Sequence, residues 1–401
     1  MSIHPLSIKI SDFDYPLPEE KIAFYPLPER DMSKLLVYRK GEIKQDVFRN
    51  IIDYLPKNSL LVFNETKVVR ARIVLYTENG QRIEIFCLEP ESPKEIVANF
   101  SERQSVVWKC FIGNNRKWKS GKYLLQMQTS RKEIRISRLA PIENAWLVKF
   151  EWDSGQSFSE ILDEIGKVPL PPYIQRDVEK SDEARYQAVF AKNEGSVAAP
   201  TASLHFTEEL MKRLAQNNIE TCKLTLHVGA GTFKPVSSEN IADHKMHSEK
   251  VVMSGENLQQ LKNAVEAGKK IIPVGTTAMR SLESLYYLDV SKAFHVDQFA
   301  PYSANSSAGS PIAQLTRLCN FTTLPLSFST SLLIVPGYTF KYCSGLITNF
   351  HQPKSTLLLL VAALLEDKCK ADSAGWRKIY DYALYNDFRF LSYGDACLFL
   401  E

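Results

Sequence analysis

Several features that define specialised classes of protein are missing from this sequence. Its seven cysteines are scattered over 401 residues and include no CxxC pair, which argues against a disulfide framework and a cysteine-rich zinc site. The N-terminal segment has acids but no apolar stretch of a signal peptide. The most apolar run, residues 357–365, is far shorter than the roughly 20 residues that span a bilayer. We therefore expect reduced thiols, a buried helix, no membrane partner and a cytoplasmic location.

A strong overall charge is also missing. The formal net charge is only +3, with 44% apolar and 24% charged residues, the balance of a globular protein. A partner with many phosphates must therefore be met by a local patch of charge rather than by the whole surface. The length predicts two or three domains.

The middle of the chain has the pattern of an antiparallel β domain. Asn79-Gly80 lies between alternating apolar runs, which is a strong signal for a hairpin. Further expected strands follow without a helical period between them. The set comprises residues 72–76, 81–88, 106–112, 122–128, 133–139 and 145–152. We therefore predict a small antiparallel β-barrel domain at residues 69–152, inserted into a second domain.

The segments on either side of this insertion alternate helix and strand. Expected helices lie at residues 19–24, 46–54, 157–165, 207–216, 256–267, 276–287, 355–365 and 373–385. Expected strands lie at residues 35–38, 60–63, 221–228, 270–274, 331–335 and 396–400. Such alternation predicts an α/β fold, a mixed sheet covered by helices. We assign residues 1–68 and 153–401 to one discontinuous core, with a long irregular excursion at residues 291–330.

Positive charge gathers in one part of the expected β domain. Residues 103–138 contain ten basic residues, one acid and several interleaved aromatics; Lys109, Arg116, Lys117 and Lys119 are among the basic residues. Cations contact phosphates and aromatic rings stack on bases, so this composition is typical of a nucleic-acid surface. A solvated basic face over an aromatic core explains it equally well.

Two glycine-containing turns resemble sites for an anion or a nucleotide. One holds Gly229 and Gly231, and the other is Gly275-Thr276-Thr277 at the start of an expected helix. Backbone N–H groups in such turns can face a carboxylate or phosphate. Neither turn is a GxGxxG motif or a P-loop, and each is also explained as an ordinary strand-to-helix connection.

Five of the seven histidines fall in candidate segments of the second half of the chain: His205, His227, His244, His247 and His351. His244 and His247 have a spacing that places two imidazoles on one helix face, but no third ligand or HExxH motif accompanies them, so we expect no metal. A serine hydrolase is disfavoured because GxSxG is missing.

Two breaker-rich stretches carry the remaining polar groups. Residues 196–206 end in His205-Phe206, and residues 345–356 contain Asn349, His351 and Lys354 ahead of the buried helix. Loops held on a rigid scaffold commonly present catalytic groups, although ordered structural loops have the same composition.

These stretches resemble the signatures of the S-adenosylmethionine:tRNA ribosyltransferase-isomerase family of the queuosine pathway. The similarity runs in order through nearly the whole chain. Its most specific segments are SVAAPTASLHF (196–206), TLHVGAGTF (225–233), HKMHSE (244–249), VGTTAMRSLES (274–284), LITNFHQPKST (346–356) and FLSYGDACL (390–398). The resemblance implies an α/β core with an inserted β-barrel domain.

The resemblance also implies an activity. The enzyme would transfer and rearrange the ribose of S-adenosylmethionine onto 7-aminomethyl-7-deazaguanine in a tRNA anticodon, giving epoxyqueuosine and releasing adenine and methionine. S-adenosylmethionine would be a co-substrate, with no prosthetic group and no metal. We expect a monomer whose partners are tRNA and S-adenosylmethionine.

Roles for single residues follow from this chemistry as hypotheses. His205, His227 and His351 are the expected proton-transfer groups, because imidazole titrates near neutral pH. Asn349 would orient a histidine. Arg280 would hold the methionine carboxylate beside Thr276 and Thr277. Asp395 or Glu283 would read the deazaguanine edge, while Arg30 and Lys354 would contact the RNA.

Two other functions fit parts of the sequence. An S-adenosylmethionine-dependent tRNA methyltransferase would show a glycine-rich loop after its first strand, which the sequence lacks. A noncatalytic tRNA-binding protein is supported only by the basic β segment, and would bind RNA with a salt-sensitive affinity without using S-adenosylmethionine.

Overall fold

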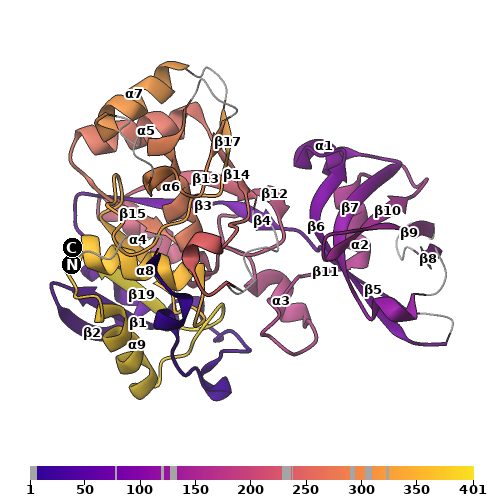
Figure 1. The fold of residues 1–401 in the computed structure, drawn as a ribbon, viewed down its shortest axis with the longest axis horizontal. Helices are drawn as coiled ribbons and strands as arrows, with labels where there is room; N and C mark the ends of the chain where they lie inside the picture. The colour runs from indigo at the N-terminus through magenta and orange to yellow at the C-terminus, as the bar shows by residue number, and fades with distance from the viewer. Residues whose placement is uncertain are drawn as a thin grey trace.

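The protein is built around two sheets of different character. The computed structural model describes residues 7–76, 79–118, 122–126, 133–227, 236, 238–289, 294–302, 309–321 and 325–401. A ten-stranded sheet forms one part and a seven-stranded sheet forms the other. Figure 1 shows the seven-stranded sheet standing to one side of the larger part, with the small pair β4 (Thr66–Val68) and β12 (Asn193–Ser196) between them.

The larger sheet is mixed and is assembled from both ends of the chain. Its order is β16-β17-β14-β13-β3-β15-β18-β19-β1-β2, with parallel pairs such as β3–β15 and antiparallel pairs such as β18–β19. The strands are β1 (Lys34–Arg39), β2 (Glu42–Val47), β3 (Ser59–Asn64), β13 (Glu220–His227), β14 (Glu249–Met253), β15 (Lys270–Val274), β16 (His295–Val296), β17 (Leu326–Thr330), β18 (Gly345–Asn349) and β19 (Ala396–Leu400).

Both faces of this sheet are buried, which β3 shows directly. Leu60, Leu61, Val62 and Phe63 are all fully buried. Because side chains alternate along a strand, Leu60 and Val62 join one apolar cluster, whereas Leu61 and Phe63 join another. The continuous apolar run is the pattern expected of a strand with helices on both sides.

The helices divide between these two faces. The first cluster contains residues of α5 (Gly255–Glu266), α6 (Thr276–Tyr287), α7 (Pro311–Phe321), α8 (Thr356–Asp367) and α9 (Gly375–Tyr385). The second contains residues of the 3-10 helix η5 (Phe48–Asp53) and of α4 (Glu208–Gln216). In α8, every residue from Leu358 to Leu365 is buried, so the apolar run is a core helix as expected.

The second sheet is antiparallel throughout and has its own apolar core. Its order is β11-β5-β6-β7-β10-β9-β8, with α1 (Ile96–Ser101) and α2 (Phe158–Ile165) beside it. The strands are β5 (Arg72–Tyr76), β6 (Arg82–Ser92), β7 (Ser105–Gly113), β8 (Lys122–Gln126), β9 (Glu133–Ile142), β10 (Ala145–Glu151) and β11 (Gly166–Lys167). The mixed α/β class with a separate antiparallel sheet is therefore confirmed.

Two details of this second sheet differ from the expected outline. Its end strands, β11 and β8, form no ladder with each other among the described residues, so it is an open sheet there. This part of the fold also includes residues beyond 152, because α2 packs in the same apolar cluster and β11 pairs with β5. The barrel and the boundaries at 69 and 152 stay predictions.

Several elements predicted from local pattern are wrong. The helix expected at residues 46–54 is the end of β2 followed by η5, since Phe48, Ile51 and Ile52 reach the core from a 3-10 turn. Residues 331–335 are not a strand; the neighbouring strand is β17. Near the N-terminus, the expected helix is only the 3-10 turn η3 (Glu19–Lys21). The described parts of the excursion contain β16, α7 and β17, so it is not irregular there.

Within the described part of the chain, none of the helices combines the length and apolar character needed to cross a bilayer.

Candidate active site

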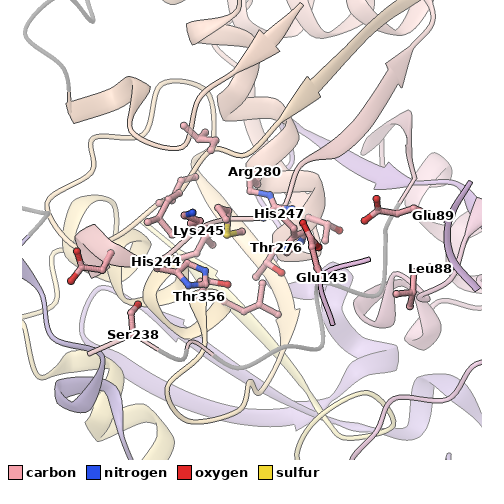
Figure 2. A pocket seen from close by; sticks show the side chains of 18 of the residues that line it. Leu88, Glu89, Glu143, Ser238, His244, Lys245, His247, Thr276, Arg280 and Thr356 are labelled. Carbon is pink, nitrogen blue, oxygen red and sulfur yellow. The ribbon is translucent and has the colours of Figure 1, made fainter. Parts of the chain in front are cut away.

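A hollow lined by residues of both sheets' regions lies where the second sheet meets the larger part of the protein. This junction cavity encloses about 540 Å³. Figure 2 shows Leu88, Glu89 and Glu143 of the second sheet region facing a hollow that His244, His247 and Arg280 line from the other side. A hollow with a few convergent polar groups at the contact between two folding units is the usual place for a substrate.

A buried ion pair forms one wall of the junction cavity. Glu249 opens β14 and its side chain has no solvent exposure. One carboxylate oxygen accepts a hydrogen bond from Nη2 of Arg280, and the other accepts one from Nε2 of His247 at 3.0 Å. The carboxylate thus neutralises the guanidinium and fixes the orientation of the imidazole ring.

A smaller inner cavity of about 100 Å³ adjoins the first one. Thr276, Thr277, Thr356 and Leu357 line both cavities. Residues 198–202 and 348–352 complete the inner wall, so the two breaker-rich stretches do meet. The cavities therefore share the first turns of α6 and α8, whose leading N–H groups have no partner within the helix.

The turn before α6 depends on a glycine. Gly275 has φ +96°, a backbone conformation that side chains disfavour. It lets the chain pass from β15 directly into α6 and places Thr276 and Thr277 at the cavities. Arg280 follows one turn later and lines the junction cavity, so these three predicted residues do come together.

His205 is held deep inside by polar contacts at both ring nitrogens. Asn349 Nδ2 donates to His205 Nε2 at 3.0 Å and also lies 3.4 Å from the carbonyl oxygen of Asp395. The proton of His205 is then on Nδ1, which donates to Ser33 Oγ at 2.8 Å. Burial lowers the pKa of His205 to about 3, so the ring is neutral at pH 7. Asn349 thus contacts a histidine, and its orienting role in the reaction stays a prediction.

His351 lines the inner cavity itself. Its Nε2 lies 3.0 Å from Thr348 Oγ1, and burial lowers its pKa to about 3. A neutral imidazole can accept a proton, but so low a pKa makes it a weak base at neutral pH. The ring is therefore better suited to hydrogen bonding with a bound group than to strong base catalysis.

His227 lies apart from the other predicted histidines. Its Nδ1 donates to the carbonyl oxygen of Gly195 at 3.1 Å, and its ring lines a separate groove with Arg103 and Lys192. Burial lowers its pKa. Gly195 has no room for a side chain, since a Cβ there would stand 2.3 Å from His227 Nδ1.

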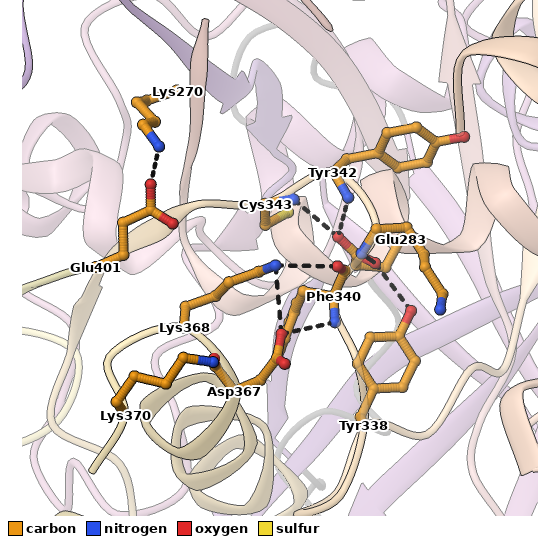
Figure 3. A network of polar contacts seen from close by, with 11 residues as sticks. Lys270, Glu283, Tyr338, Phe340, Tyr342, Cys343, Asp367, Lys368, Lys370 and Glu401 are labelled. Carbon is orange, nitrogen blue, oxygen red and sulfur yellow. Dashed lines mark hydrogen bonds and ion pairs between the residues drawn. The ribbon is translucent and has the colours of Figure 1, made fainter. Parts of the chain in front are cut away.

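Glu283 occupies a different environment from the one predicted for it. Its carboxylate accepts hydrogen bonds from the backbone N–H groups of Lys341, Tyr342 and Cys343 and from the hydroxyl of Tyr338. Figure 3 shows this network, in which the carboxylate fastens residues 338–343 to α6. Both carboxylate oxygens of Glu283 accept hydrogen bonds from the protein itself. The geometry therefore favours a structural role over recognition of the deazaguanine base.

Asp395 is also fully engaged by the protein. It is 1% exposed and accepts hydrogen bonds from the backbone N–H groups of Lys34 and Arg389 and from the Arg389 side chain. Arg30 donates to the carbonyl oxygens of Gln187 and Ala184 at 2.6 Å each. Arg30 borders a small notch beside His205. Neither Asp395 nor Arg30 lines the two cavities.

The predicted RNA-contacting lysines and arginines fall in three settings. Lys109 lines the junction cavity and pairs with Glu143 at 2.8 Å. Lys354 pairs with Asp14 at 2.6 Å, at the start of the buried helix. Arg116 and Lys117 are exposed on the 3-10 turn η6 (Asn115–Lys117) of the second sheet. Lys119, Gly229 and Gly231 lie outside the described residues.

The sequence interpretation did not single out His247 and Glu249 as a functional pair. Both belong to the HKMHSE stretch, but the i, i+3 spacing suggested a helix, whereas residues 244–248 are neither helix nor strand and lead into β14. An alternating reading of this stretch, with Glu249 opening a strand, would have placed Glu249 inside. No group of three potential metal ligands occurs in the described ranges.

A cavity with convergent polar groups, on a mixed α/β scaffold beside a separate antiparallel sheet, is the arrangement expected of an enzyme. The family model described as queuosine biosynthesis protein matches residues 10–399. The chain therefore belongs to this family, and the resemblance found in the sequence is confirmed.

Two curated relatives agree with this assignment. An S-adenosylmethionine:tRNA ribosyltransferase-isomerase of Halothermothrix orenii is 41% identical over 404 residues, covering 98% of this chain and 100% of that protein. The protein of the same name from Pelobacter propionicus is 37% identical, covering 98% and 99%. A crystal structure of S-adenosylmethionine tRNA ribosyltransferase from Thermotoga maritima is 26% identical, with a TM-score of 0.46 and coverage of 97% and 100%.

Proposed function

We propose that this chain is an S-adenosylmethionine:tRNA ribosyltransferase-isomerase of queuosine biosynthesis. The observation that carries the proposal is the family match over residues 10–399, together with relatives of that name aligned over their full length. The acceptor is 7-aminomethyl-7-deazaguanine in a tRNA anticodon, and the products are epoxyqueuosine, adenine and methionine. This finer assignment rests on the resemblance.

S-adenosylmethionine fits the pair of connected cavities best. The methionine carboxylate would lie at the start of α6, where the N–H groups of Thr276 and Thr277 and the positive end of the helix dipole favour an anion. Arg280 supports this placement because it lines the junction cavity, while its Nη2 donates to Glu249. No prosthetic group is part of the proposal.

Proton transfer is the main chemical demand on the core. The sulfonium acidifies the adjacent C5′ proton, which is lost first, and adenine then departs. The aminomethyl nitrogen attacks next. Ring closure with loss of methionine completes the reaction. His205, His227 and His351 were the predicted proton carriers. The low pKa values of His205 and His351 support hydrogen-bonding roles, and His247 with its Glu249 partner is the better-placed base, since a carboxylate stabilises the imidazolium that forms.

The RNA would approach from the side of the second sheet. Exposed Arg116 and Lys117 can neutralise phosphates, and Lys109 brings a cation to the junction cavity. We keep the division into a core of residues 1–68 and 153–401 and an inserted β-barrel domain of residues 69–152 as part of this proposal. Lys119, which lies in the same basic segment of the sequence, is kept among the proposed RNA contacts.

The test combines the protein with S-adenosylmethionine and an anticodon stem-loop that carries the aminomethyl deazaguanine. Free adenine is followed by chromatography, and the RNA by mass spectrometry. Adenine release with the mass gain of an epoxycyclopentanediol supports the proposal. A methyl-sized gain without adenine identifies a methyltransferase instead, and binding without any reaction identifies a noncatalytic RNA-binding protein.

A further inference from the structure

Three arginines from distant parts of the chain meet beside His205. Arg30 comes from the 3-10 turn η4 (Arg30–Met32), Arg185 ends α3 (Lys180–Arg185), and Arg389 precedes β19. Together with Ser33 and Ser392 they line an arginine notch of about 20 Å³. The notch is separate from the junction cavity, with which it shares no residue.

The positive charge of this notch is not balanced by its surroundings. Arg389 pairs with Asp395 at 3.2 Å. By contrast, Arg30 donates to backbone carbonyl oxygens, and the one donor bond of Arg185 goes to the carbonyl of Pro28 at 2.6 Å. Three cations thus face one carboxylate. Burial lowers the pKa of Arg30 and Arg185, as expected for guanidinium groups that lack a counter-ion.

One donor in the notch has no partner at all. Arg185 Nε is buried and makes no hydrogen bond within the described ranges of the chain. An unmade bond at a buried charged donor is costly. Guanidinium groups match the oxygens of phosphates and carboxylates, so an oxyanion is the kind of group that these donors would bind.

The dimensions of the notch restrict that oxyanion. A volume of about 20 Å³ accepts little more than one oxygen-sized group. A phosphodiester meets this condition, because one non-bridging oxygen can enter while the rest of the group stays outside. Ser392 lines both the notch and the inner cavity, where His351 and Asn349 lie. An anion in the notch is therefore next to that cavity.

We propose that the arginine notch binds a backbone phosphate of the RNA substrate, adjacent to the nucleotide whose base is presented to the cavities that hold S-adenosylmethionine. This inference rests on the proposed function. Enzymes that act on a base take it out of the stack, and the backbone on either side must then be held. Contacts with phosphates position the nucleic acid without reading its sequence.

Arg185 is the most informative residue to change, because it makes the fewest bonds. The matched control is Arg213 of α4, a half-buried arginine that likewise donates one bond to a backbone carbonyl, that of Arg49. Arg185→Gln and Arg213→Gln remove the same charge. The dissociation constant of a fluorescent anticodon stem-loop is measured at several salt concentrations, and the KM for S-adenosylmethionine is measured beside it.

We expect Arg185→Gln to weaken RNA binding about tenfold or more, the effect of one charge-assisted hydrogen bond. It should also reduce the slope of log K against log[salt] by about 0.7 to 1, the loss of one phosphate contact. Arg213→Gln should change neither. Equal RNA affinities for the two variants would overturn the inference, as would a raised KM for S-adenosylmethionine with unchanged RNA binding, which would assign the notch to the methionine carboxylate. Wild-type protein that binds RNA but releases no adenine would instead contradict the proposed function.

Discussion

The two parts of the molecule place their polar groups in opposite ways. In the larger part, Glu249, His205 and Asn349 are buried and bonded to other side chains beside the cavities. In the second sheet, Arg116 and Lys117 are exposed on a turn. Fixed geometry in a dry site suits bond-making chemistry, whereas solvated cations suit a long-range attraction to phosphates. The comparison indicates a division of work between chemistry and RNA binding.

The largest effect should come from the buried ion pair. Glu249→Gln leaves Arg280 buried without its counter-charge, so we expect the free energy of unfolding to fall by about 3 kcal/mol. Adenine release should fall about 100-fold or more, because His247 loses the carboxylate that orients it. Chemical denaturation and chromatography measure the two effects.

A double variant separates stability from chemistry at this pair. Glu249→Gln with Arg280→Met removes both charges, and we expect it to recover most of the stability but none of the activity. Restored adenine release in the double variant would show that the pair is only structural.

A smaller loss is expected at Glu283. The Glu283→Gln amide keeps one acceptor oxygen but turns N–H donors toward the backbone N–H groups of residues 341–343, so unfolding should become easier by about 2 kcal/mol. Catalysis per folded molecule should stay within about twofold. If stability is unchanged while the KM for RNA rises, the original prediction that Glu283 reads the base would be right.

The buried histidines make stability depend on pH. Both His205 and His351 have a pKa of about 3 in the folded protein, below the unfolded value of about 6.5. Between these values the unfolded chain binds more protons, so stability is full above about pH 6.5 and decreases as the pH falls toward 3. Each histidine contributes about 1.4 kcal/mol per pH unit in that range.

Urea denaturation at pH 7.5 and 5.5 tests this dependence. His351→Gln should lose less stability over that interval than wild-type protein does, whereas the control Arg213→Gln should keep the wild-type difference. A His351→Gln variant with an undiminished difference would mean that the ring is protonated inside the folded protein.

The smallest effect is expected on the second sheet. Arg116→Gln with Lys117→Gln should raise the KM for RNA several-fold and reduce the salt slope by about 1 to 2, with stability and the turnover rate unchanged. Lys212→Gln with Arg213→Gln on α4 removes the same charge from the larger part and should not change the KM. If both double variants raised the KM for RNA equally, RNA binding would not be specific to the second sheet.

Much of this arrangement could be predicted from the sequence because the patterns are local. Residues 270–274 and 396–400 are strands exactly as their apolar runs predict, and Ser355 caps the buried helix α8. The turn at Gly275-Thr276-Thr277 was also predicted, since a glycine between an expected strand and an expected helix commonly marks a turn.

The errors arise where tertiary contacts decide the structure. Residues 46–54 have helical spacing, yet β2 pairs with β1 and leaves only a 3-10 turn to reach the core. The pairing of Glu249 with Arg280 joins residues from different elements. The arginine notch joins three segments, each more than 150 positions from the other two. The local periodicity of apolar residues does not predict such contacts.

The most direct test of the division of work is single-turnover adenine release at saturating RNA. We predict that Glu249→Gln with Arg280→Met remains slow when the RNA is saturating, and that Arg116→Gln with Lys117→Gln reaches the wild-type rate. A slow rate for the second variant at saturating RNA, or a wild-type rate for the first, would contradict the account.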